Sequence, residues 1–214
     1  MDDEIRIISV KAKKNRQNCI IIFSNDDTFK CSYDIVLKYK LGNNSIISSD
    51  LFSEIKKEQR IYDVKQVAFN YVSYKPRTEK QIRQRLKEKG FEKVESDSAI
   101  GFLSKFDLVD DEKYSKQFIA DYLKRKSVGK SKLISELLRK GIDKALAEDS
   151  VEKFFSKDDT LEYAMKAVNK KLRVIRHKPL EKQRDSLIRF LFASGFDWDI
   201  IRIVLKEIKF GVDE

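Results

Sequence analysis

One helical pattern occurs three times in this chain of 214 residues, and each occurrence ends in a glycine. Each copy carries two apolar residues four positions apart, which places both on one face of a helix. The glycine follows four positions later, where the end of a helix needs a left-handed residue without a Cβ atom. The glycines recur with a period longer than that of most helical solenoid repeats. The matched positions are Ile82, Leu133 and Leu187, then Leu86, Leu137 and Leu191, and then Gly90, Gly141 and Gly195.

Matches outside this pattern extend each copy to three short helices, with the glycine closing the middle one. The further matched sets are Ile100, Val151 and Leu205; Leu103, Phe154 and Ile208; Val67 and Phe118; and Tyr71 and Tyr122. We therefore predict a mostly α-helical protein with three tandem three-helix repeats, at residues 61–109, 110–158 and 159–214. Because each repeat stacks on its neighbours, we expect them to form an elongated curved array.

Residues 1–60 have a different pattern, which predicts a small antiparallel β unit. Apolar and β-branched residues alternate or cluster in 4–11, 18–24 and 28–33, and polar residues 13–18 and 24–27 supply the turns. We expect three strands in a meander, followed by a short helix over 34–41, capped by Asp34, and a turn at 42–45. Cys19 and Cys31 are expected to lie near each other across this sheet as small buried apolar side chains.

Helix signals connect this unit to the repeats. Asp50 is a candidate cap for a helical region that continues to Tyr71 and stops at Lys75, because the residue before a proline is pushed out of helical geometry. Thr78 then caps the next helix, and a third helix is expected over about 96–106.

Composition narrows the cellular setting. No apolar run approaches the ~18 residues of a membrane span, and the N-terminal residues 1–4 lack the basic and apolar parts of a signal peptide. The two cysteines have no metal-ligand spacing. We expect a soluble cytoplasmic protein without a cofactor.

The net charge of +10 is concentrated in the repeats. Residues 75–89 contain seven basic and two acidic side chains, residues 124–140 seven and one, and residues 166–184 eight and one. All three windows cover the passage from the first to the second helix of a repeat. Stacked repeats would align them into a basic stripe that selects a polyanion or an acidic protein surface. The alternative is a set of solvated lysines whose alignment is incidental. The stripe residues are Arg77, Lys80, Arg83, Lys124, Arg125, Lys130, Arg139, Lys140, Lys170, Lys171 and Arg173.

The remaining candidates for chemistry favour structural roles. Gly129-Lys130-Ser131 is similar to the end of a phosphate-binding loop, but the first glycine is missing, so Ser131 is expected to cap a helix. A second hypothesis keeps a phosphate site without the loop: free backbone N–H groups at the start of this helix, together with Lys130 and Lys132, would hold one DNA phosphate.

The acidic cluster Asp107, Asp110, Asp111 and Glu112 is consecutive rather than convergent, so helix capping explains it better than a two-metal site. His177 has no nucleophile pattern around it, and Trp198 is expected to pack at the start of the last helix. We predict no catalytic and no metal-binding residues.

Two kinds of short motif stand out in the repeats: the Val109-Asp110-Asp111 link, and the two Lys-Gly steps at Lys89-Gly90 and Lys140-Gly141. With these features the chain resembles the RecX regulatory family. The resemblance is strong over residues 60–155 and continues more weakly to the C-terminus. The chain departs from the family at Lys105-Phe106, where a glycine is often found, and in an extra loop around residues 174–179.

The resemblance implies tandem three-helix repeats, and the β unit is similar to an extension found in some members. It also implies a non-enzymatic regulator that binds the RecA recombinase filament on single-stranded DNA and inhibits its ATPase and strand-exchange activities, within DNA repair and the SOS response. Double-stranded DNA is a further candidate partner, and a monomer is expected. The alternative is a sequence-nonspecific DNA-binding protein that needs no recombinase. A third alternative, a nuclease that uses the acidic link, predicts magnesium-dependent cleavage.

Overall fold

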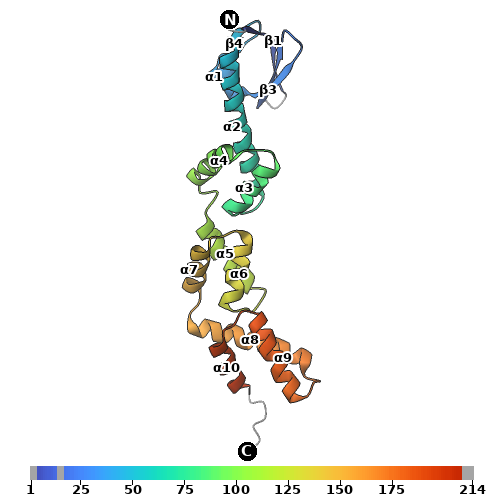
Figure 1. The fold of residues 1–214 in the computed structure, drawn as a ribbon, viewed down its shortest axis with the longest axis vertical. Coiled ribbons are helices and arrows are strands. Elements are labelled where there is room, and N and C mark those ends of the chain that lie inside the picture. The colour runs from blue at the N-terminus through green and yellow to red at the C-terminus, as the bar shows by residue number, and fades with distance from the viewer. Residues whose placement is uncertain (1–3, 14–16, 209–214) are drawn as a thin grey trace, which may run out of the picture. The chain divides into compact units, whose positions relative to one another are not determined.

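The structure is a computed structural model that describes residues 4–13 and 17–208, apart from the side chain of Lys157. The N-terminal residues 1–3, part of the first predicted turn (14–16) and the end of the third predicted repeat (209–214) lie outside the described residues. The chain forms two compact units, one of residues 1–75 and 82–108 and the other of residues 76–81 and 109–214. The first unit contains four strands and the helices α1 (Tyr33–Lys38), α2 (Ser49–Tyr74) and α4 (Lys93–Lys105) (Figure 1).

A four-stranded antiparallel sheet opens the first unit. Its strands are β1 (Glu4–Ala12), β2 (Asn18–Phe23), β3 (Thr28–Ser32) and β4 (Ile46–Ser48), in the order β3-β2-β1-β4. The predicted three-stranded meander is confirmed. The sequence prediction missed β4, a short strand that pairs with Glu4–Arg6 at the start of β1. A strand this short has no alternation of its own to detect.

The two cysteines face each other in this sheet, as expected. Cys19 on β2 pairs directly with Cys31 on β3, and both side chains are buried as free thiols. Burial raises the pKa of the Cys31 thiol to about 12, so it stays protonated at neutral pH. A buried protonated thiol behaves as a small apolar group.

Helices α1 (Tyr33–Lys38) and α2 (Ser49–Tyr74) are capped by the serines Ser32 and Ser48, not by the predicted aspartates. The Ser32 hydroxyl accepts a hydrogen bond from the Ile35 N–H at 3.3 Å, and the Ser48 hydroxyl accepts one from the Leu51 N–H at 3.2 Å. Asp34 and Asp50 lie inside the first turns instead. The predictions that these two residues are caps are therefore wrong, because each strand leads into its helix slightly earlier than the pattern indicated.

We expect Ser48→Ala to lower the free energy of unfolding of the first unit by about 1 kcal/mol, because it removes the cap of α2. Asp50→Ala should cost only a few tenths of a kcal/mol, since it removes an exposed charge near the helix dipole. Urea unfolding followed by circular dichroism measures both. An equal loss in the two variants would contradict the assignment of the cap to Ser48.

The long helix α2 connects the sheet to the first repeat. Its Ile55 packs in the core of the sheet, while Val64, Ala68 and Val72 are buried farther along. Helix α4 (Lys93–Lys105) packs against it within the same unit (Figure 1). It begins earlier than predicted because Glu92 and Glu95 form a capping box. Helix α2 ends at Tyr74 and Lys75 is extended before Pro76, as predicted.

The repeated pattern corresponds to the middle helices α3 (Glu79–Glu88), α6 (Lys130–Lys140) and α9 (Leu180–Ala193). All six matched isoleucine and leucine positions are fully buried. The three glycines have φ angles of 78°, 95° and 82°, the left-handed region in which a Cβ atom is strained. The prediction of a glycine-terminated middle helix is therefore confirmed in all three copies.

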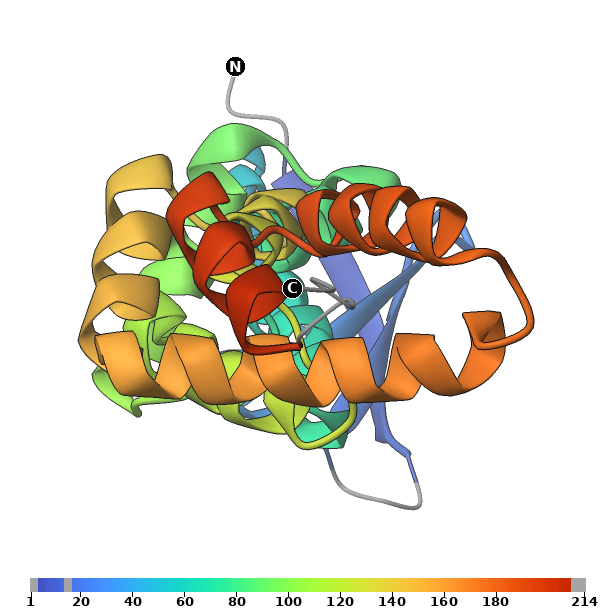
Figure 2. The same ribbon diagram turned by 90° about the horizontal axis from the view of Figure 1, so that it is seen from below.

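The second and third repeats are completed by α5 (Asp111–Leu123), α7 (Lys144–Phe154), α8 (Lys157–Ile175) and α10 (Trp198–Glu207). In Figure 2, α8 and α9 run antiparallel around the loop of residues 176–179, with α10 beside them. Burial differs at one matched position: Phe154 is exposed, and its neighbour Phe155 is buried in the core of the second repeat.

Two glycine backbones meet where the second repeat contacts the third. The N–H of Gly129 donates to the carbonyl of Ser194 at 2.9 Å, and the N–H of Ser131 donates to the carbonyl of Gly195 at 3.3 Å. A Cβ atom on Gly129 would lie 2.2 Å from the Gly195 carbonyl oxygen. This close approach fixes how the end of α9 sits on the start of α6.

The contact also corrects the prediction for Ser131. The cap of α6 is Gly129, and Ser131 is the second residue of the helix. Its N–H and that of Gly129 are occupied by backbone carbonyls, so they are not free to hold a phosphate.

Candidate interaction surface

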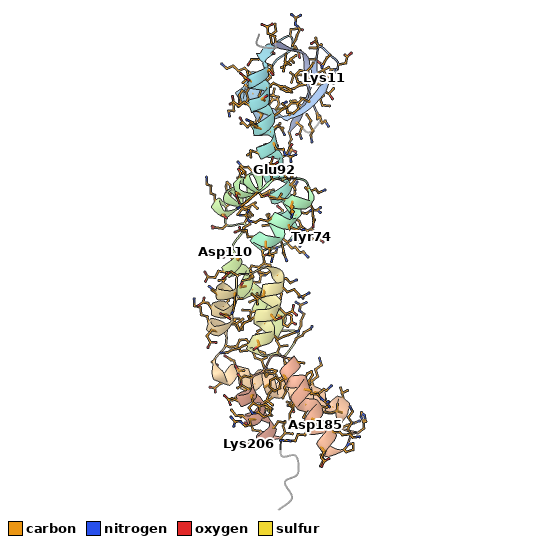
Figure 3. All side chains as sticks on the ribbon, viewed as in Figure 1. Lys11, Tyr74, Glu92, Asp110, Asp185 and Lys206 are labelled. Atoms are coloured by element: carbon orange, nitrogen blue, oxygen red, sulfur yellow. The ribbon has the colours of Figure 1, made fainter. Side chains whose placement is uncertain are left out.

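The acidic link between the first two repeats has structural roles. Asp110, labelled in Figure 3, caps α5 by accepting a hydrogen bond from the Lys113 N–H at 2.9 Å. Asp111 accepts one from the Glu79 N–H at 2.9 Å, and burial raises the pKa of its carboxyl. In the part of the chain that the structure describes, no three histidine, cysteine or acidic side chains converge as metal ligands. The expectation that this cluster caps a helix is confirmed.

The second unit contains a groove of about 470 Å³ that we call the cationic groove. Its walls come from the end of α5, the link before α6, the start of α6, the second half of α8 and the end of α9. All of its charged lining residues are basic, and none of the described residues that line it is acidic. They are Arg125, Lys126, Lys132, Lys170 and Lys171. Its uncharged lining residues include the buried Val128 and Ala167 and the aromatic residues Tyr122 and Phe190.

A second groove of about 520 Å³ shares the link of residues 124–127 with the first. Lys124, Arg125, Lys126 and Lys166 are its charged lining residues, again without an acidic one among the residues described. Lys124 is ion-paired with Asp121 at 3.1 Å on α5, and Lys166 is paired with Glu162 on α8. The link therefore carries exposed cations between two grooves.

One anion, Glu136 on α6, compensates part of this charge. The hydrogen bond from Arg139 lowers the pKa of the Glu136 carboxyl, and the charges of Lys132 and Lys126 act in the same direction. The Arg139 nitrogen lies 2.5 Å and the Lys132 nitrogen 3.8 Å from the carboxylate. Glu136 is thus ionised at neutral pH, and it neutralises one of several cations rather than the groove as a whole.

A third groove, of about 700 Å³, has a mixed lining. Here Lys130 pairs with Glu152 at 2.8 Å, and Asp197, Asp199 and Lys206 lie around it (Lys206 is labelled in Figure 3). Lys130 is a residue of the predicted stripe, but it points into this groove instead of the cationic one. A surface with both signs of charge offers no net attraction to a polyanion.

Other predicted stripe residues gather at the opposite end of α6. Lys140 lies at the C-terminal end of this helix, and its carbonyl accepts a hydrogen bond from the Thr78 hydroxyl at 2.8 Å. A Cβ atom on Gly141 would lie 2.6 Å from the Cβ atom of Lys80, so the stem of Lys80 covers this glycine. Burial raises the pKa of the Tyr114 hydroxyl, and the charge of Arg77 acts in the opposite direction. Tyr114 lies one helical turn before Phe118, and the Lys140 ammonium group lies 6.0 Å from the centre of the Phe118 ring. With a rise of about 1.5 Å per residue, Lys132 and Lys140 are separated by about 12 Å along the helix.

The structure therefore divides the second-unit members of the predicted stripe between several places. Arg125, Lys170 and Lys171 line the cationic groove, Lys124 lines the second groove, and Arg173 is exposed on α8. Arg139 pairs with Glu136. Arg83 belongs to the first unit, where it pairs with Asp97 at 2.5 Å. The binding roles of all these residues stay predictions.

Part of the cationic groove was not predicted from the sequence. Lys126 and Lys132 lie in the basic window 124–140 but are not members of the predicted stripe. Val174 and Phe190 also line the groove, and a sequence does not tell whether the neighbours of an apolar residue leave it open. The one local signal is that Val174 lies inside the basic window 166–184.

His177 is exposed in the loop between α8 and α9, and its lack of a catalytic role stays a prediction. Trp198 is the first residue of α10 and stacks on Phe192, with ring centroids 5.9 Å apart. None of the helices within the described residues has the length and apolar character needed to cross a membrane.

Comparison with known proteins gives a consistent result. Three family models match consecutive parts of the chain: the first, second and third three-helix domains of RecX, at residues 65–103, 110–151 and 157–205. The regulatory protein RecX of Clostridium perfringens strain 13 is 31% identical over 95% of this chain and 96% of its own length. That of Finegoldia magna is 29% identical over 92% and 96%.

Two solved structures share the fold. A crystal structure of a regulatory protein RecX covers 94% of this chain and 99% of its own, with a TM-score of 0.78 and 19% identity. The RecX of Lactobacillus salivarius covers 70% of this chain and 97% of its own, with a TM-score of 0.65 and 23% identity.

Proposed function

Because this chain belongs to the RecX regulatory protein family, we propose that it binds the RecA recombinase filament on single-stranded DNA and inhibits its ATPase and strand-exchange activities. It acts as a regulator rather than an enzyme, in the cytoplasm and in DNA repair and the SOS response.

The observation that supports this proposal most directly is the link of residues 124–127. It carries three consecutive exposed cations between two grooves whose charged lining residues are all basic. A nucleoprotein filament presents phosphates and acidic protein surface together, and a surface of one sign is attracted to both. The excess charge also accelerates the first encounter with such a partner.

Repeats suit a polymeric target. A filament offers the same site on each successive protomer, and a protein with several repeats contacts more than one of them. Linked weak contacts then give a higher overall affinity than each contact alone. The regulator inhibits only if it binds one state of the filament better than another, since equal binding to both states shifts nothing.

The central test uses RecA filaments assembled on circular single-stranded DNA, with ATP hydrolysis and strand exchange followed after the full-length chain is added. The expected result is a dose-dependent loss of both activities. In the variant Lys170→Glu/Lys171→Glu, the concentration needed for half inhibition should rise by at least about tenfold, because two groove cations become anions.

A matched control changes the net charge by the same amount in the same unit. Lys113→Glu and Lys144→Glu lie in the first turns of α5 and α7, where a carboxylate is favourable to the helix. This double variant should inhibit RecA as the parent chain does. Equal inhibition by both double variants, with unchanged helical content, would overturn the role of the groove. An unchanged RecA ATPase with the parent chain would overturn the proposed function.

A DNA-binding protein that needs no recombinase is the second candidate, favoured by the three exposed cations of the link. It predicts tight binding to bare single-stranded or double-stranded DNA, with an affinity that falls steeply as salt is raised. Fluorescence anisotropy on labelled oligonucleotides across a salt titration, from about 50 to about 200 mM, measures this. Binding to bare DNA as tight as binding to RecA-coated DNA would favour this candidate. The same samples, incubated with Mg²⁺, would reveal strand cleavage.

A further inference from the structure

The cationic groove combines two properties that a simple phosphate-binding surface does not need. Its charged lining residues, which we call the rim, are all basic among the residues described, while most of its uncharged lining residues are apolar. Val128 and Ala167 are buried and form what we call the floor, but Val174 on α8 is 65% exposed although it lines the same groove. A single exposed valine is ordinary on a protein surface. Here the exposed valine lines the same groove as five cations, whereas Val128 and Ala167 are buried. Val174 is therefore a branched aliphatic lining residue that an apolar side chain of a ligand can reach.

The aromatic rings beside the groove do not offer free platforms on both faces. The Lys126 ammonium lies 5.3 Å from the centre of the Tyr122 ring, and the Lys171 ammonium lies 5.2 Å from that of Phe190. Single-stranded nucleic acid is held by stacking its bases on open aromatic faces and by placing phosphates along a basic track. A ring face covered by a cation is lost to stacking, while the aliphatic floor offers nothing to a flat polar base.

An acidic peptide with aliphatic side chains fits both properties. Its carboxylates would meet the basic rim, and an aliphatic side chain would pack on Val174 and the floor. The groove volume of about 470 Å³ is sufficient for one or two such side chains, and falls within the usual range of ligand sites. The two kinds of contact lie within one groove, so a single short segment reaches both.

We propose that the cationic groove binds a short acidic protein segment that inserts an aliphatic side chain against Val174. This inference rests on the proposed function and deepens it, since it names the part of the partner that the groove recognises. The recognised feature is an acidic and aliphatic segment of protein rather than a DNA phosphate.

The test uses the full-length chain and a fluorescein-labelled peptide, Glu-Asp-Leu-Glu-Asp-Leu-Glu, with both ends blocked. Two comparison peptides replace the leucines by serines or every carboxylate by its amide. Fluorescence anisotropy should show binding of the first peptide, and binding at least about tenfold weaker for each of the others, which corresponds to about 1.4 kcal/mol. Equal binding of the leucine and serine peptides would overturn the proposal, as would the absence of binding to all three.

A substitution at Val174 distinguishes apolar contact with the peptide from electrostatic attraction between the peptide and the basic residues. Val174→Ser should weaken the leucine peptide severalfold and leave the weak serine peptide unchanged, which is the signature of a direct coupling. Val94→Ser is the control, because Val94 is 75% exposed on α4 in the other unit. If a short oligothymidine displaces the leucine peptide and its own binding is weakened by Val174→Ser, the groove binds nucleic acid and the proposal fails.

The RecA assay keeps this inference distinct from the proposed function. If the chain inhibits the RecA ATPase but binds none of the peptides, the proposed function stands and the groove inference fails. If the leucine peptide binds with the expected preference while the RecA ATPase is unaffected, the groove inference stands and the proposed function fails.

Discussion

Gly129→Ala is expected to lower the free energy of unfolding of the second unit by about 3 kcal/mol, at the upper end of what overpacking typically costs. The added Cβ atom would lie 2.2 Å from the carbonyl oxygen and 2.4 Å from the carbonyl carbon of Gly195, and both are backbone atoms that no side-chain rotation can move. Separation of the two segments also weakens the hydrogen bonds donated by Gly129 and Ser131, each worth about 1 kcal/mol.

Backbone strain does not contribute to this effect, because Gly129 has φ −86° and ψ 173°, which alanine adopts freely. Two other glycines provide controls. Gly90 has φ +78° with nothing within 4 Å of an added Cβ atom, so Gly90→Ala should cost only the strain of about 1–2 kcal/mol. Gly101 lies inside α4 with open space around it, so Gly101→Ala should stabilise the helix by up to about 1 kcal/mol.

The measurement is urea unfolding followed by tryptophan fluorescence. Trp198 is the only tryptophan of the chain and lies in the second unit, so its signal reports the unit that contains Gly129. Circular dichroism follows both units together. A Gly129→Ala variant as stable as the parent chain would contradict the close approach of the two backbones.

Leu137→Ala is expected to destabilise the second unit by about 2–5 kcal/mol, the range for removing a fully buried leucine side chain and leaving a cavity. Leu137 is 0% exposed, and it occupies the second apolar position of the repeated pattern. It packs among Ile119, Leu133 and Val151 in the core of the second repeat.

The neighbouring residue is a matched control in the same helix. Leu138 is 40% exposed, so Leu138→Ala makes the same chemical change with less loss of packing and should cost less than about 1 kcal/mol. The two variants differ by one position, which corresponds to a turn of about 100° around α6. Equal costs, measured by the same urea unfolding, would contradict the assignment of the buried face.

Local signals in the sequence predicted most of the helical repeats. Each pair of apolar residues, such as Ile82 and Leu86, lies one turn apart on one helix. Each glycine adopts the left-handed conformation that the backbone needs at the end of that same helix. Thr78 and Asp110 cap their helices as expected, since the hydroxyl of Thr78 accepts from the Gln81 N–H and the carboxylate of Asp110 from the Lys113 N–H. Such features depend on neighbours in the chain, so a sequence alone contains them.

The features that were missed depend on residues far apart in the sequence. Strand β4 exists because Ile46–Ser48 reaches Glu4–Arg6, at the other end of the N-terminal β unit. The cap of α6 is Gly129 because the carbonyls of Ser194 and Gly195, which belong to the third repeat, occupy the N–H groups at its start. No window of local sequence contains either partner.

The cations illustrate the same division. The sequence determined how many basic residues fall in each repeat and that acidic residues are scarce beside them. The tertiary structure decided which of them share a groove: Lys132 lines one groove with Lys170 and Lys171, whereas Lys130 pairs with Glu152 in a groove that the start of α10 also lines. A separation of two positions on a helix means a turn of about 200°, so Lys130 and Lys132 lie on nearly opposite sides of α6. The packing of the third repeat against each side then determines whether a lysine meets other cations or a carboxylate.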